Sequence, residues 1–171
     1  MSATIRAERA QDINAIREVS ERAFGQSLEG RLVDPLRSNG GVMLSLVAVI
    51  EDRVVGHILY SPVSLISGNE IIMGAGLGQM AVLPEFHGQG IGGRLIEAGT
   101  QRLRGMGCPF VVVVGHPEYC PRFGFQPAAG YGIKCGWEVP DDVFMVLILD
   151  QSKMKDVAGL AKYREEFSAV A

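Results

Sequence analysis

One junction between a strand and a helix constrains this 171-residue chain more than any other stretch. Met80–Leu83 reads as the end of a strand and Arg94–Ala98 as good helix sequence, but four glycines lie between them, within residues 88–93. Each glycine in a helix interior costs about 1 kcal/mol relative to alanine, so their presence requires a reason. The pattern predicts a strand, a turn of bare backbone and then a helix.

Such a turn has the properties of an anion-binding site. A helix N-terminus leaves backbone N–H groups unpaired and carries about half a positive charge. Glycine adopts positive φ and lets a bulky anion approach without meeting a Cβ atom. The turn therefore favours a phosphate or pyrophosphate ligand, although glycine used only for tight helix–sheet packing would leave a similar pattern.

Two common phosphate-binding motifs do not fit. A P-loop has Lys followed by Ser or Thr after its last glycine, whereas Gly93 is followed by Arg94-Leu95. Gly88-x-Gly90-x-x-Gly93 matches the GxGxxG pattern of dinucleotide-binding folds, but those folds have an acidic residue at the end of the next strand. Here that strand ends in Val113-Val114-Gly115.

A third motif fits better. Val82-x-Pro84-x-x-His87-x-x-Gly90-x-Gly92 resembles the acyl-CoA motif of the GNAT superfamily of N-acetyltransferases, in which Gln/Arg-x-x-Gly-x-Gly/Ala follows a strand ending in Val-x-Pro. The later segment YCPRFGF, residues 119–125, is similar to the Tyr-x-x-x-Gly-Phe segment of that family, and its long form HPEYCPRFGFQPA resembles a bacterial subgroup. The resemblance covers about residues 5–149. It implies one three-layer α/β (α+β) domain, residues 1–171, around a mixed, mostly antiparallel sheet.

Hydrophobic periodicity and turn residues locate the elements along the chain. Strands are expected at 4–7, 45–51, 54–63, 70–83, 109–114, 131–135 and 143–150. Helices are expected from residue 13, where Asp12 would cap the first turn, and at 28–37, 90–106 and 118–123. A last amphipathic helix is expected at about 157–170.

The resemblance also implies a set of CoA-binding residues. Backbone groups of Met80–Val82 would pair with the pantetheine arm of acetyl-CoA as another strand would, and amides of Gly88–Gly93 would hold its pyrophosphate. His87 departs from the Gln or Arg of the family and need not be charged at pH 7, which predicts weaker or pH-dependent CoA affinity. The full expected set is Met80, Ala81, Val82, His87, Gly88, Gln89, Gly90, Ile91, Gly92 and Gly93.

The activity implied is transfer of an acetyl group from acetyl-CoA to a primary amine of a small molecule or peptide by direct attack. GNAT enzymes commonly have a tyrosine four residues before the Gly of Gly-Phe, where it protonates the departing CoA thiolate. Here that position is Cys120, and Tyr119 is its neighbour. Because one residue of offset rotates a side chain by about 100° on a helix, Cys120 is preferred narrowly as the acid and Tyr119 is the reserve. A buried structural cysteine, with solvent protonating the thiolate, is the other alternative. Glu29 and His116 are both candidates for the base.

Two other functions stay open. A GNAT-like domain can bind CoA as a sensor or partner module and catalyse nothing. A dinucleotide-binding oxidoreductase is less favoured, because the acidic residue it needs is missing. His57, in the middle of an expected strand, is interpreted as a structural histidine rather than a catalytic one.

Composition narrows the classes of partner, cellular location and cofactor that the chain is expected to have. The chain is 47% hydrophobic with a net charge of −3 and has no Lys/Arg patch for nucleic acid. Its apolar runs are too short to span a membrane, and no signal peptide is visible, so a cytoplasmic protein is expected. The three cysteines and three histidines lack metal-ligand spacing, so no metal is expected. A homodimer is compatible with the sequence, which does not decide the oligomeric state.

Overall fold

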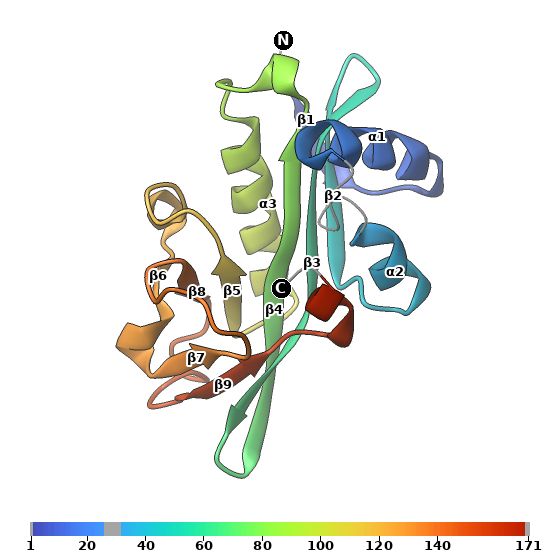
Figure 1. Cartoon of the computed structure of the whole chain (residues 1–171). Helices are drawn as coiled ribbons and strands as arrows, with labels where there is room; N and C mark the ends of the chain where they lie inside the picture. Colours follow the sequence, from blue (N-terminus) through green and yellow to red (C-terminus); the bar gives the residue numbers. More distant parts are fainter. Residues whose placement is uncertain (1, 26–31, 170–171) are drawn as a thin grey trace.

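A central mixed sheet runs through the computed structural model, which describes residues 2–25 and 32–169 (Figure 1). Its strands are β1 (Thr4–Ala7), β2 (Leu44–Ile50), β3 (Arg53–Ser67), β4 (Glu70–Val82), β5 (Phe110–Val114), β6 (Gln126–Pro127), β7 (Ile133–Cys135), β8 (Phe144–Ile148) and β9 (Gly159–Lys162). The α-helices are α1 (Ile13–Phe24), α2 (Val33–Ser38) and α3 (Ile91–Gly105). Short 3-10 turns are η1 (Ala10–Asp12), η3 (Pro84–Phe86), η4 (Cys120–Phe123), η5 (Ala128–Tyr131) and η6 (Glu165–Ala169).

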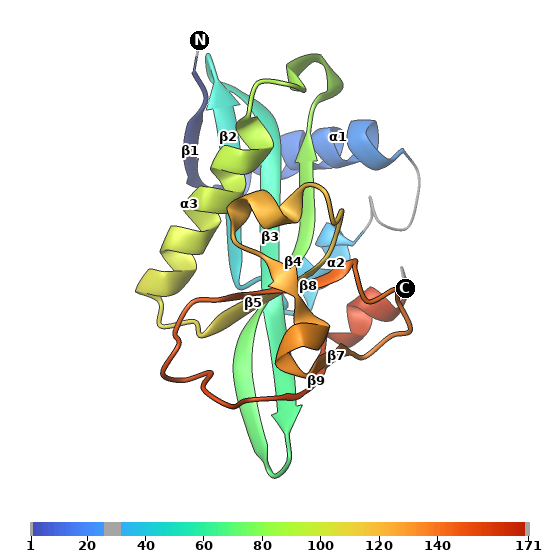
Figure 2. The same cartoon turned by 90° about the vertical axis from the view of Figure 1, so that its left-hand side faces the viewer.

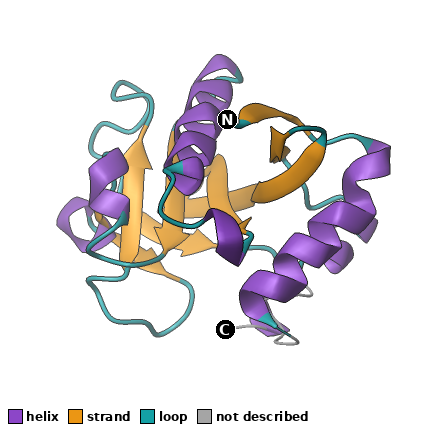
Figure 3. Cartoon of the chain, turned by 90° about the horizontal axis from the view of Figure 1, so that it is seen from above, coloured by secondary structure: helices purple, strands orange, loops and turns teal. Residues whose placement is uncertain are grey.

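The sheet has the predicted three-layer arrangement. Figure 3 shows it between α3 on one side and α1 with α2 on the other. The strand order is β1-β2-β3-β4-β5-β8-β6, and β9 joins by pairing with β3 and β7. Neighbouring strands are antiparallel except for β4 with β5 and β7 with β9. The connection from β4 through α3 to β5 is therefore a crossover between parallel strands, and the glycine junction is its first turn.

α3 follows its predicted periodicity and is fixed firmly to the sheet. Figure 2 shows it lying across β1, β2 and β3. Gly99 allows close contact, because a Cβ there would lie 2.5 Å from the ring of Tyr60. Each large apolar side chain buried in this way contributes about 1.5–3 kcal/mol. The buried apolar side chains of α3 are Ile91, Leu95, Ile96 and Leu103. Their packing fixes the direction in which the N-terminus of the helix points.

Asp12 does not cap α1 as expected. Its carboxylate accepts a hydrogen bond from the backbone N–H of Arg9 at 2.7 Å and forms an ion pair with Arg6 at 2.7 Å. The Asp12 side chain makes no cap hydrogen bond to the first turn of α1. Because η1 precedes α1 directly, Asp12 closes that turn and ties it to β1. The second expected helix is also shorter, since α2 begins at Val33 and residues 28–31 lie outside the described residues.

The expected helix at 157–170 is wrong. Residues 159–162 form β9, which pairs with the end of β3 and with β7, and η6 follows. β3 extends to Ser67, beyond the expected end at residue 63, and its last residues give β9 a partner. Gly159 allows this approach, because a Cβ there would collide with the carbonyl of Ile66. Pairing between distant segments therefore overrides the local helical pattern.

Within the described residues, no helix is long and apolar enough to span a bilayer.

Candidate active site

β4 and β5 run side by side briefly and then diverge. In the described chain their parallel pairing is confined to Ala75 with Val111 and Gly76 with Val112. We call this point the fork. Beyond it, residues 77–82 of β4 pair with β3, while β5 pairs with β8. One edge of β4 therefore presents N–H and C=O groups that an extended ligand can bind as an added strand would.

A bulge in β4 lies just past the fork. The register between β3 and β4 shifts after Leu59, so that Gly78 has no opposite residue between Leu77 and Gln79. Bulges bend a strand and increase its local twist. The bulge thus turns the end of β4 away from β5.

The four glycines of the junction have two different roles. Gly88 and Gly90 have φ of 80° and 78°, and among the described residues no atom lies within 4 Å of where their Cβ would be. Gly92 and Gly93 allow close packing instead: a Cβ would lie 3.0 Å from the Tyr119 hydroxyl at Gly92 and 3.0 Å from the Phe123 ring at Gly93. Gly88 and Gly90 therefore fit the interpretation as an open turn, and Gly92 and Gly93 fit the interpretation as tight helix packing.

The N-terminus of α3 opens onto this turn. Gly90 is the N-cap residue, no side chain of the described residues caps the helix, and its first turn carries no acidic residue. The amide of Arg94 bonds back to the carbonyl of Gly90 at 3.1 Å, which leaves the amides of residues 91–93 for another acceptor. Together with the helix dipole, these amides suit an anion.

The edge of β4, the glycine turn and η4 meet in a cleft of about 510 Å³. Eight of the ten predicted CoA-binding residues line it. Gln89 is exposed on the turn instead, and Gly93 packs on Phe123. Three apolar residues that sequence reasoning missed also line the cleft: Ala23, Phe24 and Phe86. The lining is completed by Met80, Ala81, Val82, His87, Gly88, Gly90, Ile91, Gly92, Tyr119 and Arg122.

The missed residues had a weak sequence signal. Phe24 ends the apolar face of the predicted first helix, and Phe86 lies inside the Val-x-Pro motif region. Both residues are phenylalanines, whose side chains have no acidic, basic or nucleophilic group. Only the fold brings the end of α1 beside the end of β4.

His87 bends back onto β4. Its Nε2 lies 2.8 Å from the carbonyl oxygen of Val82. Because a carbonyl can only accept, Nε2 carries a proton and donates it. The imidazole is therefore held at the end of the β4 edge.

Tyr119 and Cys120 have different surroundings. Tyr119 lines the cleft, beside Gly92 and Met80, and burial raises the pKa of its hydroxyl, with Cys120 adding to the rise and Arg122 opposing it. Cys120 is 6% exposed and belongs to the hydrophobic core, where its sulfur lies against Gly115. Burial also raises the pKa of the Cys120 thiol. Of the two predicted acids, only the tyrosine is among the described residues that line the cleft.

Of the two candidate bases, His116 is not among the described residues that line the cleft. His116 follows β5, but its side chain is 83% exposed and lies 4.0 Å from Glu118. Glu29 lies outside the described residues. Of two exposed arginines near the junction, Arg94 donates to the carbonyl of Ala3 at 2.5 Å, and Arg122 lies over the ring of Tyr119.

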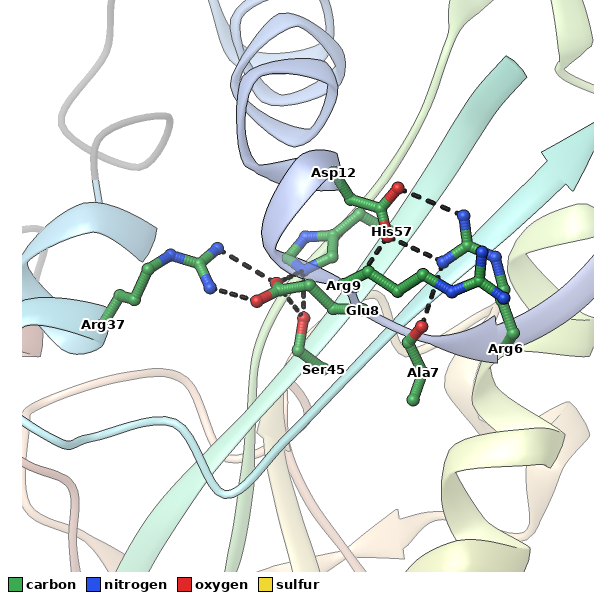
Figure 4. A network of polar contacts seen from close by, with 8 residues as sticks. All are labelled: Arg6, Ala7, Glu8, Arg9, Asp12, Arg37, Ser45 and His57. Carbon is green, nitrogen blue, oxygen red and sulfur yellow. Dashed lines mark hydrogen bonds and ion pairs between the residues drawn. The ribbon is translucent and has the colours of Figure 1, made fainter. Parts of the chain in front are cut away.

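His57 belongs to a buried polar network on the face of the sheet that carries α1 and α2. Figure 4 shows Glu8 between Arg37 and Ser45. The Ser45 hydroxyl donates to Glu8 at 2.7 Å, so its oxygen must accept from Nε2 of His57 at 2.8 Å. Burial lowers the pKa of His57 to about 4, Arg37 adds to the effect and Glu8 opposes it. A neutral, hydrogen-bonded histidine agrees with a structural role.

Within the described residues, no group of three His, Cys, Asp or Glu side chains could hold a metal ion.

Residues 4–128 match the family model for the acetyltransferase (GNAT) domain. The chain belongs to the GNAT family. It is 42% identical over 134 residues to the N-acetyltransferase YjhQ of Escherichia coli K12, covering 77% of this chain and 74% of that protein. It is 33% identical over 165 residues to the E. coli N-acetyltransferase YhbS, covering 96% of this chain and 98% of that protein.

Solved structures of the GNAT family agree with the fold. The crystal structure of E. coli YhbS in complex with CoA superposes with a TM-score of 0.92 at 32% identity, covering 98% of this chain and 93% of that one. A GNAT acetyltransferase from Brucella melitensis in complex with acetyl-CoA gives a TM-score of 0.77 at 37% identity, covering 96% and 97%. The predicted family and fold are therefore confirmed, and the chain is an acetyltransferase of this family.

Proposed function

We propose that this GNAT protein binds acetyl-CoA in the 510 Å³ cleft and transfers the acetyl group to a primary amine by direct attack. One observation carries the proposal: past the fork, an edge of β4 that pairs with no strand of the described chain runs toward the glycine turn, where no described side chain caps α3. The edge suits the amide groups of a pantetheine arm, and the helix end suits a pyrophosphate. The CoA and acetyl-CoA complexes of the two structural relatives support the same ligand.

In the proposed reaction the neutral amine attacks the thioester carbonyl carbon. The C–N bond forms, the carbonyl π electrons move to oxygen, and a backbone N–H of residues 80–82 donates to that oxyanion. Collapse of the tetrahedral intermediate restores the carbonyl and breaks the C–S bond. The amine loses one proton to a base or to solvent, and the CoA thiolate gains one.

We infer that Tyr119, rather than Cys120, supplies the proton to the thiolate. Tyr119 lines the cleft beside Met80, whereas Cys120 is packed in the core against Gly115. A tyrosine hydroxyl is protonated at neutral pH, as an acid must be before it acts, and burial shifts the pKa of Tyr119 further upward. Glu29 and His116 remain hypotheses for the base.

The test has a binding step and a turnover step. Titration calorimetry with acetyl-CoA measures binding, and thiol release measured against polyamines, amino acids, aminoglycosides and peptides finds the acceptor. Tyr119→Phe should lower kcat by about 10²-fold, the lower end of general acid catalysis, and leave acetyl-CoA binding nearly unchanged. Cys120→Ala is the matched control.

Three outcomes contradict parts of the proposal. Full activity of Tyr119→Phe together with loss in Cys120→Ala would assign the acid to Cys120. Activity on hydroxyl acceptors alone would exclude the amine. Tight CoA binding without turnover on any acceptor, with a stable protein partner, would indicate a sensor module instead.

A further inference from the structure

Three glycines alternate along β4 on either side of the fork, and an aromatic ring covers each one. A Cβ on Gly74 would lie 2.5 Å from the Phe110 ring, and one on Gly76 would lie 2.7 Å from the Tyr163 ring. The third glycine is Gly78, where a Cβ would lie 2.9 Å from Cζ of Phe167. Of the three, only Gly78 lies past the last pairing of β4 with β5.

Of these three rings, Phe167 is therefore the one that covers β4 past the fork. A pantetheine arm that starts at the glycine turn and follows this edge runs from Val82 toward the fork, so its acyl end comes closest to the fork. At the bulge, Gly78 has no side chain to separate the ligand from Phe167. The ring is 4% exposed and belongs to the hydrophobic core.

The position of Phe167 is fixed by contacts from distant parts of the chain. Its ring packs on Tyr163 at 5.0 Å and on Trp137 at 6.3 Å between centroids. Arg164 donates to the carbonyl of Asn39 at 3.0 Å, and Asn39 donates to Glu166 at 3.3 Å. These bonds tie η6 to the end of α2, and Figure 1 shows η6 beside that helix end. The Phe167 ring is held in place, because moving it requires breaking these contacts.

We propose that Phe167 limits the length of the acyl group that this enzyme accepts, by closing the space past Gly78 to chains longer than acetyl. The inference rests on the proposed function, because it assumes that acyl-CoA follows the β4 edge. Its physical basis is steric: the Phe167 ring occupies the space beside Gly78 that a side chain there would fill, so a longer acyl chain that reached Gly78 would meet the ring.

Calorimetry with acetyl-, propionyl- and butyryl-CoA tests the proposal without knowing the acceptor. The quantity measured is the ratio of the Kd for butyryl-CoA to the Kd for acetyl-CoA. Wild type should discriminate clearly against butyryl-CoA. Phe167→Ala should lower the ratio roughly fifteenfold, the value for two methylenes that become buried at about 0.8 kcal/mol each. Phe167→Leu, a milder change, should improve mainly propionyl-CoA binding.

Phe110→Leu is the matched control, because its ring covers Gly74 below the fork. It should loosen the core while leaving the ratio as in wild type. A wild type that binds butyryl-CoA as well as acetyl-CoA, an unchanged ratio in both Phe167 variants, or an equal change in Phe110→Leu would overturn the inference. Absence of acetyl-CoA binding by wild type would overturn the proposed function instead.

Discussion

The buried His57 should make the stability of this protein strongly pH-dependent between pH 7 and 5. Its pKa is lowered from 6.5 to about 4 in the fold, chiefly because burial disfavours the charged ring. The unfolded chain therefore binds a proton at pH values where the folded protein does not. The stability from His57 is fully present above pH 6.5 and is lost as the pH falls toward 4.

The magnitude follows from those two pKa values. The full contribution of His57 to the free energy of unfolding is roughly 3 kcal/mol, and about 2 kcal/mol of it is lost between pH 7 and pH 5. Glu8 and Arg37 are the charged groups that face the ring, and their effects on the His57 pKa oppose one another. Glu8 has a lowered pKa in the fold, because hydrogen bonds from Arg37 and Ser45 outweigh its burial. The ordinary pKa of a glutamate is near 4.3, so Glu8 contributes little to the change in stability above pH 5.

Urea unfolding at pH 7 and pH 5, followed by the fluorescence of Trp137, the one tryptophan, measures this difference. His57→Gln should be less stable than wild type at pH 7 but lose much less on going to pH 5. His116→Gln replaces an exposed histidine and should keep the wild-type loss. A wild-type difference below about 0.5 kcal/mol, or the same loss in His57→Gln, would refute the assignment of a buried neutral ring.

Substitutions at glycines of the junction and of α3 should separate binding from stability. Gly90→Val requires a β-branched residue at φ of 78° and should weaken acetyl-CoA binding at least tenfold by calorimetry, while thermal unfolding shows a domain that is still folded. Gly92→Ala should gain helix propensity but displace the Tyr119 hydroxyl, so kcat should fall while Tm hardly changes. Gly105→Ala, with no atom within 4 Å of its Cβ site among the described residues, should raise Tm slightly and leave kcat unchanged.

Most of the fold was predictable because its signals are local. In the β4–α3 crossover the strand and the helix each have their own periodicity, and glycines mark the turn between them. The family motif spans all three. The C-terminal segment was not predictable in this way. The partner of β9 is the end of β3, about one hundred residues earlier, and nothing within residues 157–170 indicates that this edge is open.

The choice between Tyr119 and Cys120 could not be made from the sequence for a different reason. The rotation argument assumes that both residues lie on one α-helix. In the structure η4 begins at Cys120, and Tyr119 is its N-cap residue, with φ of −108° and ψ of −54°. Pro121 at the start and Gly124 at positive φ at the end make this a short 3-10 turn. The 100° step of an α-helix therefore does not relate the two side chains.

The glycines of this chain illustrate how local rules and function conflict. Gly78 weakens a strand and Gly92 weakens a helix, and each would be replaced if secondary structure alone decided the residue. At both positions an aromatic group takes the space of the missing side chain, Phe167 at Gly78 and Tyr119 at Gly92. The glycine can be read from the sequence, but its aromatic partner cannot, because it lies 89 residues away in one case and 27 in the other. A glycine in a regular element therefore indicates a close approach, and only the fold identifies which residue makes it.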